Sequence, residues 1–279
     1  MKQSEYELIA LDMDGTLLDS SQRITPRARA AVRRILEQGR QVTFATGRCR
    51  TQLTQYLEYF PKMRYLICEN GACICDLKEG KDLFRRSIAV REVRHILGAV
   101  EKEDVLITLF IGNRSFLGEG SLTRLEEFGL ESYRPVFAES AVVVEDLFSF
   151  YRSRPLEVEK VSLFFRNGTG GGPARMRVQE RVRRLPLSIA VSASGNLELT
   201  AENVNKGTGL ELLCGFLKLP LSAAVAVGDG GNDMQLLRTA GLGVAMENAP
   251  QALRAAAQAV VPDCDHEGAA IAMERYLLR

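Results

Sequence analysis

The sequence of 279 residues has few histidines and no long apolar run. Its two histidines are too few to complete a zinc quartet with the six cysteines, which are scattered through apolar stretches and are expected to be small buried residues in a reducing compartment. No uninterrupted apolar run approaches the roughly 18 residues of a membrane helix, and the N-terminal residues lack the apolar core of a signal peptide. We therefore expect a cytoplasmic protein with no membrane partner.

A strong charge of either sign is also missing. The 36 Lys and Arg residues nearly balance the 35 Asp and Glu residues, which leaves a net charge of +1. A predicted helix over residues 174–185 carries several arginines on one face, but the excess charge around it is too small for a nucleic-acid surface. We therefore expect no nucleic-acid partner. An argument from charge must rest on particular groups of residues and not on the net charge of the chain.

Short apolar segments alternate with helical patterns in the first and last thirds of the chain. Expected strands are 8–11, 42–45, 65–68, 223–227, 243–245 and 259–261, and expected helices are 25–38, 50–58, 208–217, 233–240 and 250–257. Pro26 suits a first helical turn, and Gly39 suits the position after a helix end. Almost wholly apolar short strands that alternate with helices are typical of a parallel sheet covered on both faces. The pattern predicts a doubly wound, Rossmann-like α/β core.

The middle of the chain has a different pattern. Longer expected strands (105–111, 158–165 and 187–193) alternate there with the amphipathic helices 91–100 and 174–185. This favours an α+β domain inserted over residues 83–193, with residues 1–82 and 194–279 forming the core. The glycine-rich segment 167–173 lacks the Gly-Lys-Ser/Thr of a phosphate-binding P-loop, so it is expected to be a flexible loop.

Two aspartates follow the first predicted strand. Asp12 and Asp14 begin the segment Asp12-Met-Asp-Gly-Thr-Leu-Leu18, at the edge where open parallel sheets bind their ligands. Two carboxylates crowded at one sheet edge repel by roughly 4 kcal/mol at about 4 Å and an effective dielectric of about 20, unless a cation or a proton intervenes. An ordinary turn can also contain Asp-x-Asp, so this segment alone does not decide between structure and chemistry.

A second acidic turn changes the interpretation. Val227-Gly-Asp-Gly-Gly-Asn-Asp233 also follows an apolar strand, and it carries Asp229 and Asp233. A doubly wound sheet can place the ends of these two strands side by side. The oxygen-lined site that results is of the kind magnesium prefers, and Mg²⁺ is what an anionic nucleophile needs before it can approach a phosphate dianion.

Two further segments fit phosphate binding. Ala45-Thr-Gly-Arg48 follows the second predicted strand and offers a hydroxyl and a backbone amide turn. Lys206 lies in Asn205-Lys-Gly-Thr-Gly209, just before a predicted helix, and offers an ammonium at a helix N-terminus. Each feature is weak alone, but in order with the aspartates they indicate phosphoryl chemistry.

With these four segments the chain resembles the haloacid dehalogenase (HAD) superfamily of aspartate-nucleophile phosphatases, specifically its Cof-type branch, in which an α/β cap is inserted late. The resemblance extends to Glu69-Asn-Gly-Ala72 and to the ending Asp263-Cys-Asp-His-Glu-Gly-Ala269. That ending departs from the more usual Asn-Asp-Glu-Asp-Gly, which leaves substrate selection near His266 open.

The resemblance implies a role for each segment. Asp12 would be the nucleophile and a magnesium ligand, and Asp14 the general acid and base, with its backbone carbonyl also reaching the metal. Asp229 and Asp233 would complete the Mg²⁺ site. Residues implied in binding the phosphoryl group or the substrate are Met13, Gly15, Thr46, Gly47, Arg48, Lys206 and Asn232.

The expected function is Mg²⁺-dependent hydrolysis of a small phosphomonoester, such as a sugar phosphate or a similar metabolite, through an aspartyl-phosphate. A phosphomutase or phosphotransferase would use the same intermediate, and the sequence does not separate these from a hydrolase. A non-catalytic phosphate-binding regulator is a third alternative, although it would not need Asp14 to move protons. The substrate, the cap residues that select it and the oligomeric state stay open.

Overall fold

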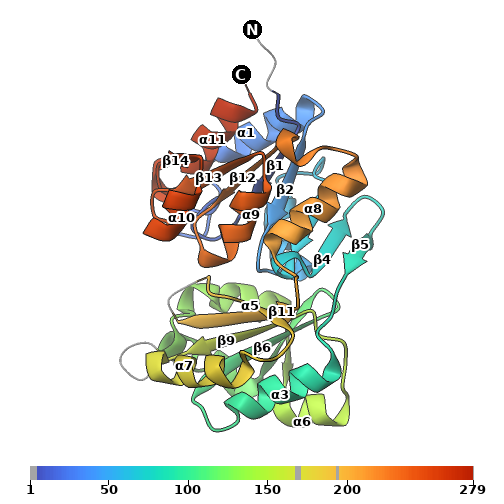
Figure 1. Cartoon of the computed structure of the whole chain (residues 1–279), viewed down its shortest axis with the longest axis vertical. Helices are drawn as coiled ribbons and strands as arrows, with labels where there is room; N and C mark the ends of the chain where they lie inside the picture. The colour runs from blue at the N-terminus through green and yellow to red at the C-terminus, as the bar shows by residue number, and fades with distance from the viewer. Residues whose placement is uncertain (1–4, 167–170, 193–194, 279) are drawn as a thin grey trace. The chain divides into compact units, whose positions relative to one another are not determined.

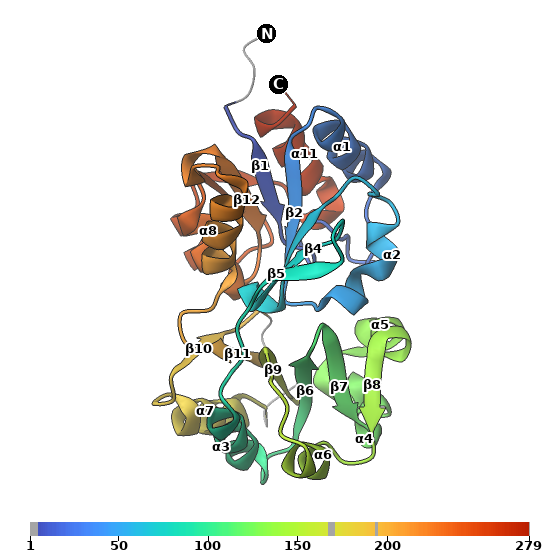
Figure 2. The same ribbon diagram turned by 90° about the vertical axis from the view of Figure 1, so that its right-hand side faces the viewer.

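A computed structural model describes residues 5–166, 171–192 and 195–278 (Figures 1 and 2). The chain divides into a core unit, made of Met1–Arg48, Leu53–Phe84 and Asn205–Arg279, and an inserted unit, made of Cys49–Gln52 and Arg85–Val204. The expected boundary at residues 193 and 194 lies inside this inserted unit. The difference arises because β11 (Asn196–Ala201) pairs with β9 (Lys160–Phe165) in the second sheet.

The core unit contains an eight-stranded sheet in the order β14-β13-β12-β1-β2-β3-β4-β5. Its strands are β1 (Leu8–Leu11), β2 (Gln41–Ala45), β3 (Tyr65–Cys68), β4 (Cys73–Asp76), β5 (Lys81–Arg85), β12 (Ala224–Gly228), β13 (Leu242–Met246) and β14 (Ala259–Val261). From β14 to β3 all neighbours are parallel, and β4 runs antiparallel to β3. The six expected core strands are confirmed, whereas β4 and β5 were not expected.

Helices cover both faces of the core sheet (Figure 1). They are α1 (Pro26–Glu37), α2 (Thr54–Leu57), α8 (Lys206–Leu217), α9 (Met234–Thr239), α10 (Gln251–Ala256) and α11 (Gly268–Tyr276). Ile9 and Leu11 of β1 pack in a cluster with residues of α1 and α11. Leu8 and Ala10 point to the other face and pack with residues of α8 and α9. The alternation explains why the strand is apolar throughout, and the doubly wound α/β class is confirmed.

Capping fixes α1 as the sequence predicted. The Thr25 side chain accepts a hydrogen bond from the amide of Ala28, Pro26 occupies the first turn, and Gly39 has a φ of 80° after the helix end. The helix expected over residues 50–58 is different, because it splits into a 3₁₀ turn (Arg50–Leu53) and the single turn of α2. There the Gln52 side chain accepts from the Cys49 amide, a local hydrogen bond that competes with regular helix.

The inserted unit contains a six-stranded sheet in the order β10-β11-β9-β6-β7-β8. The strands not yet given are β6 (Val105–Ile111), β7 (Arg114–Gly118), β8 (Ala141–Val144) and β10 (Leu187–Ala190), and the helices are α3 (Val90–Val100), α4 (Glu119–Leu122), α5 (Arg134–Ser140), α6 (Leu147–Ser153) and α7 (Gly171–Val182). Neighbours from β10 to β7 are antiparallel, and β7 and β8 are parallel. This mixture of mainly antiparallel strands and helices is the α+β arrangement expected for the insertion.

The loop expected over residues 167–173 is partly wrong. Gly171, Gly172 and Pro173 belong to the first turn of α7, where proline is well tolerated, while residues 167–170 lie outside the described residues. A Cβ on Gly171 would overlap the carbonyl of Arg166, so a close backbone approach accounts for this glycine. No helix in the described ranges is long and apolar enough to cross a membrane.

Candidate active site

Three carboxylates gather where β1 and β12 end. The two strands are parallel neighbours with Leu11 beside Val227, so the residues that follow them emerge at one edge of the sheet. Asp12, Asp229 and Asp233 each place a carboxylate oxygen within 4.8 Å of the others. Asp12 is 6% exposed and Asp233 is fully buried. The structure thus brings Asp12 of the first predicted turn together with Asp229 and Asp233 of the second.

Lys206 connects two of these carboxylates. Its buried Nζ donates to Oδ1 of Asp12 at 2.6 Å and to Oδ1 of Asp233 at 2.7 Å. Asn205 places it, because the Asn205 and Thr208 side chains form a capping box at the start of α8. Burial alone would lower the pKa of Lys206, but the two carboxylates raise it, so the ammonium stays charged.

The cluster holds more carboxylates than ammonium groups, and the pKa values of its aspartates reflect this excess of negative charge. Burial and then the charge of Asp233 raise the pKa of Asp12 well above its ordinary value, and Lys206 only partly opposes them. The same two causes raise the pKa of Asp229 to about 6, although a hydrogen bond from Thr16 opposes them. A divalent cation would relieve this excess of negative charge, and carboxylate oxygens are the donors that Mg²⁺ prefers. The three aspartates therefore fit the expected metal.

Asp229 is held by Thr16 and Asn248, for which the sequence analysis predicted no role. The Thr16 hydroxyl donates to Oδ1 of Asp229 at 2.8 Å, and the Asn248 amide donates to Oδ2 at 2.9 Å and to the carbonyl of Gly15 at 3.0 Å. Asn248 follows β13, so its place just beyond an apolar strand was the available signal. Gly15 has a φ of 76°, and a Cβ there would overlap the Asp229 carboxylate. Glycine is thus needed for both backbone conformation and space.

Asp233 also organises its own turn. Its Oδ2 accepts from the amides of Asp229 and Gly230 at 3.1 and 2.8 Å, while its Oδ1 accepts from Lys206. Both oxygens are thus engaged with the protein. A charged acceptor strengthens each of these bonds. The side chain therefore fixes the position of Asp229 as well as adding charge to the cluster.

Asp14 lies apart from the carboxylate cluster and is paired with Arg48. Nε and Nη2 of Arg48 donate to the two carboxylate oxygens at 2.9 and 2.5 Å, and Nη2 also donates to the side chain of Gln22 at 2.6 Å. The guanidinium, 5% exposed, lies 5.5 Å from the centre of the Tyr56 ring. The two donors of the guanidinium match the two oxygens of the carboxylate, so the ion pair fixes the orientation of the Asp14 side chain. The sequence suggested a substrate role for Arg48 but not this pairing.

The other expected phosphate-binding residues surround the same sheet edge. Thr46 is 1% exposed after β2, and its hydroxyl accepts from the amide of Arg48 at 3.1 Å across Gly47. The carbonyl of Thr46 accepts from the Asn70 amide at 3.0 Å. The Asn232 amide then donates to the Asn70 side chain at 3.2 Å. Asn70, which lies in the segment Glu69-Asn-Gly-Ala72, thus links the segments that follow β2 and β12, and it has a φ of 56°.

The segment after Asp12 forms a tight turn. The carbonyl of buried Met13 accepts from the amides of Thr16, Leu17 and Leu18 at 3.3, 3.0 and 2.9 Å. The turn brings Gly15 beside Asp229. The binding of a phosphoryl group by Met13, Gly15, Thr46, Gly47, Arg48, Lys206 and Asn232 stays a prediction.

Known proteins share this architecture. The family of haloacid dehalogenase-like hydrolases matches residues 9–273, and the chain therefore belongs to this family, as the motifs predicted. Phosphatase YwpJ of Bacillus subtilis (strain 168) is 29% identical over 97% of this chain and 100% of the relative. An HMP-PP phosphatase of Yersinia pestis is also 29% identical, over 98% of this chain and 96% of the relative. A haloacid dehalogenase-like hydrolase structure from B. subtilis superposes with a TM-score of 0.84 at 26% identity, covering 97% and 100% of the two chains.

These findings confirm the expected enzyme class. The family match covers most of the chain, and both relatives, which align almost from end to end, are phosphatases. The protein is a phosphatase with an α/β core.

Proposed function

We propose that the protein hydrolyses a small phosphorylated metabolite in a Mg²⁺-dependent reaction that passes through an aspartyl-phosphate on Asp12. The observation that carries the proposal is the buried Lys206, which contacts both Asp12 and Asp233 while Asp229 lies beside them. A buried ammonium shared by two carboxylates does little for stability alone, since removing buried charge altogether is often neutral or stabilising. Its position suits a phosphoryl group arriving at Asp12.

The residues that would hold Mg²⁺ are Asp12, Asp229 and Asp233, with the backbone carbonyl of Asp14. When bound, the ion supplies positive charge between the anionic nucleophile and the phosphate dianion. Thr16 and Asn248 support this arrangement, because each donates to a different oxygen of Asp229 and so restricts its rotation.

Asp12 is oriented for attack. Among the described residues Lys206 is the only hydrogen-bond donor to its carboxylate, and it binds Oδ1. Oδ2 is therefore available to form a bond with phosphorus while the bond from phosphorus to the leaving oxygen breaks. Thr46, Lys206, Asn232 and the amides of the Met13–Gly15 turn and of Gly47 would hold the phosphoryl oxygens during this step.

Asp14 would move the proton. It gives a proton to the leaving alkoxide in the first step, and in the second step it takes one from the water that attacks the aspartyl-phosphate. The two hydrogen bonds from Arg48 hold the Asp14 carboxylate in a defined orientation. For the first step Asp14 must gain a proton. We therefore propose that Arg48 turns away from Asp14 and toward the substrate when the substrate binds.

The relatives support a class of substrate. One relative is an HMP-PP phosphatase, which supports a small phosphorylated metabolite as the substrate. Sugar phosphates stay the first choice from the family resemblance. Product analysis distinguishes the alternatives, because a hydrolase accumulates inorganic phosphate and a phosphomutase or phosphotransferase yields a new phosphate ester.

Trapping the intermediate tests the proposal. Acid quenching during turnover should leave phosphate on the peptide that contains Asp12, in a bond that hydroxylamine cleaves. The label should disappear in Asp12→Asn and accumulate in Asp14→Asn when the substrate has a good leaving group, because the second step then lacks its base. If Asp14→Asn releases the leaving group in a burst and yet carries no label, the covalent mechanism is refuted.

A further inference from the structure

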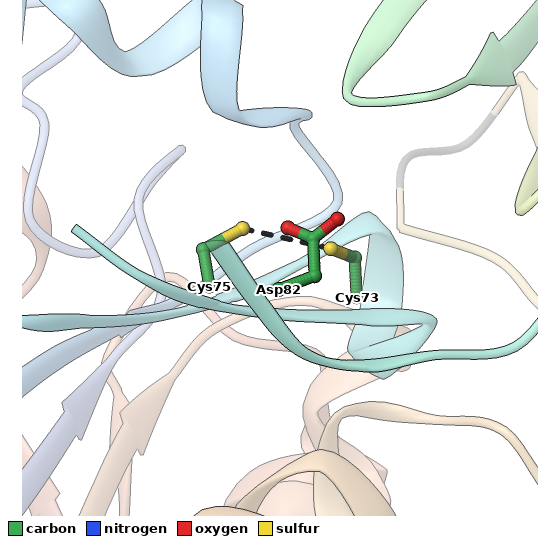
Figure 3. Close-up of side chains that lie close together, drawn as sticks. All are labelled: Cys73, Cys75 and Asp82. Carbon is green, nitrogen blue, oxygen red and sulfur yellow. Dashed lines mark hydrogen bonds between the residues drawn. The ribbon is translucent and has the colours of Figure 1, made fainter. Parts of the chain in front are cut away.

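Four possible metal ligands lie on three neighbouring strands of the core sheet. Cys68 ends β3, Cys73 and Cys75 belong to β4, and Asp82 belongs to β5. Cys73 and Cys75 are two residues apart and so share a face of the sheet, and Cys68 is paired directly with Cys73. Figure 3 shows the Asp82 carboxylate and the thiols of Cys73 and Cys75 directed toward one another.

The distances suit a common ion. The sulfur atoms of Cys73 and Cys75 are 3.5 Å apart, and a carboxylate oxygen of Asp82 lies within 4.8 Å of both. The thiols of Cys68 and Cys75 also interact through a hydrogen bond. Two sulfurs bound to one tetrahedral Zn²⁺, each at about 2.3 Å, would be about 3.8 Å apart. Little rearrangement is needed to bring the ligand atoms of Cys73, Cys75 and Asp82 around one ion, whereas Cys68 lies outside this group and its side chain would have to move toward the ion.

We propose that Cys68, Cys73, Cys75 and Asp82 form a binding site for one thiophilic divalent cation, with Zn²⁺ as the first choice. Three sulfurs and one carboxylate oxygen make four donors, as in closed structural zinc sites. Soft sulfur ligands select Zn²⁺ over Mg²⁺, so this site is chemically distinct from the oxygen-lined cluster around Asp12. It does not depend on the proposed phosphatase mechanism.

The surroundings attract a cation. The negative charges of Asp82 and of buried Glu69 both act on the Cys73 thiol, while a hydrogen bond with Cys75 and burial raise the pKa of that thiol. The thiols of Cys73 and Cys75 are therefore protonated without a metal, and metal binding would release protons. The three cysteines are fully buried, whereas Asp82 is partly exposed and marks the side from which an ion can enter.

A bound ion would stabilise one edge of the core sheet. It would join β3, β4 and β5 at the edge of the core sheet, and β5 ends where the chain passes into the inserted unit. Edge strands have neighbours on one side only, so a metal link there adds a constraint that the ladder alone lacks.

Cobalt titration tests the site, because Co²⁺ bound to thiolate gives a sulfur-to-metal charge-transfer band that carboxylate ligands do not give. The full-length protein, stripped of metal and kept reduced, is titrated with Co²⁺ in excess Mg²⁺, which fills the carboxylate cluster. We expect the band to saturate at one equivalent and to disappear when Zn²⁺ is added. The band should be lost in Cys73→Ser/Cys75→Ser and retained in Cys214→Ser and Cys264→Ser, which change cysteines outside the cluster.

Asp82→Asn keeps the proposal testable if the double variant does not fold. Loss of partners outside the ligand shell weakens metal sites by roughly 10- to 100-fold, so loss of a direct ligand should weaken Co²⁺ binding by at least about tenfold. Absence of the band in the unmodified protein would overturn the proposal. So would a band that persists in Cys73→Ser/Cys75→Ser, or one that disappears in Cys264→Ser.

Discussion

Replacing Lys206 by methionine should destabilise the protein and abolish most of its activity. Its Nζ, fully buried, lies 2.6 Å from Asp12 and 2.7 Å from Asp233, so the substitution leaves two buried carboxylates without their cation. Removing one partner of a buried ion pair costs about 3–5 kcal/mol, and we expect this loss in the free energy of unfolding, measured by urea denaturation at pH 8 without Mg²⁺. Loss of a charged donor at the phosphoryl group should lower kcat about 100- to 1000-fold.

The pH dependence of this loss has a definite sign. Lys206 lowers the pKa of Asp12 in the folded protein, so the substitution raises that pKa further above its unfolded value. A folded state that holds protons more tightly than the unfolded state gains stability as the pH falls. The difference in unfolding free energy between the unmodified protein and Lys206→Met should therefore be smaller at pH 5 than at pH 8.

The inserted unit offers a matched control. Lys160 is 2% exposed and donates to Glu198 at 2.8 Å, so Lys160→Met also breaks a buried ion pair. It should lose comparable stability and yet keep its turnover of a small aryl phosphate. Equal activity losses in the two variants, or a Lys206→Met protein as stable at pH 8 as the unmodified one, would refute the reasoning.

Three further predictions concern the acidic cluster and the turn beside it. Asp14→Asn should lower kcat far more than Mg²⁺ affinity, whereas Asp229→Asn should first raise the Mg²⁺ concentration needed for half-maximal activity; indistinguishable metal titrations would contradict these roles. Gly15→Ala should cost at least about 2 kcal/mol in urea denaturation and weaken Mg²⁺ binding, while Gly39→Ala, with a φ of 80° and nothing within 4 Å, should cost only about 1–2 kcal/mol of backbone strain. Without Mg²⁺ the unfolding free energy of the unmodified protein should fall relative to that of Asp229→Asn as the pH rises from about 4 to about 6, because the pKa of Asp229 is raised to about 6 in the folded state; a rise in this difference over the interval would contradict the assignment.

Local patterns were enough to predict the parallel core. Strands such as β1 are apolar on both faces, and α1 has its Thr25 cap, Pro26 and Gly39 in the expected places. Two of the strands that were missed, β4 and β8, are only four residues long. β4 depends on a hairpin whose turn begins with Glu69, at a φ of 54°, and β8 is only partly buried along its length. Whether such segments form strands depends on pairing with segments that are distant in the sequence, and local propensity does not predict this pairing.

The parts of the site that were missed also depend on contacts between residues that are distant in the sequence. Asp12, Asp229 and Lys206 were found because each follows or precedes a recognisable element. The pairing of Asp14 with Arg48 spans 34 residues. The grouping of Cys68 with Cys75 likewise depends on strand register, because a shift of one residue would turn a whole strand's side chains to the other face. Contacts of this kind follow from the fold and cannot be read from spacing alone.

The charge imbalance at Asp12 links stability to the proposed reaction. Three carboxylates with one ammonium cost folding energy without a cation, as the raised pKa values of Asp12 and Asp229 show. The same imbalance would give the proposed site its affinity for Mg²⁺, and a ligand that binds only the folded state stabilises it by RT ln(1 + [L]/Kd). Substitutions that neutralise the cluster should therefore make the metal-free protein more stable and its stability less responsive to Mg²⁺. A site in this state would be more stable but could no longer bring an anionic nucleophile and a phosphate dianion together.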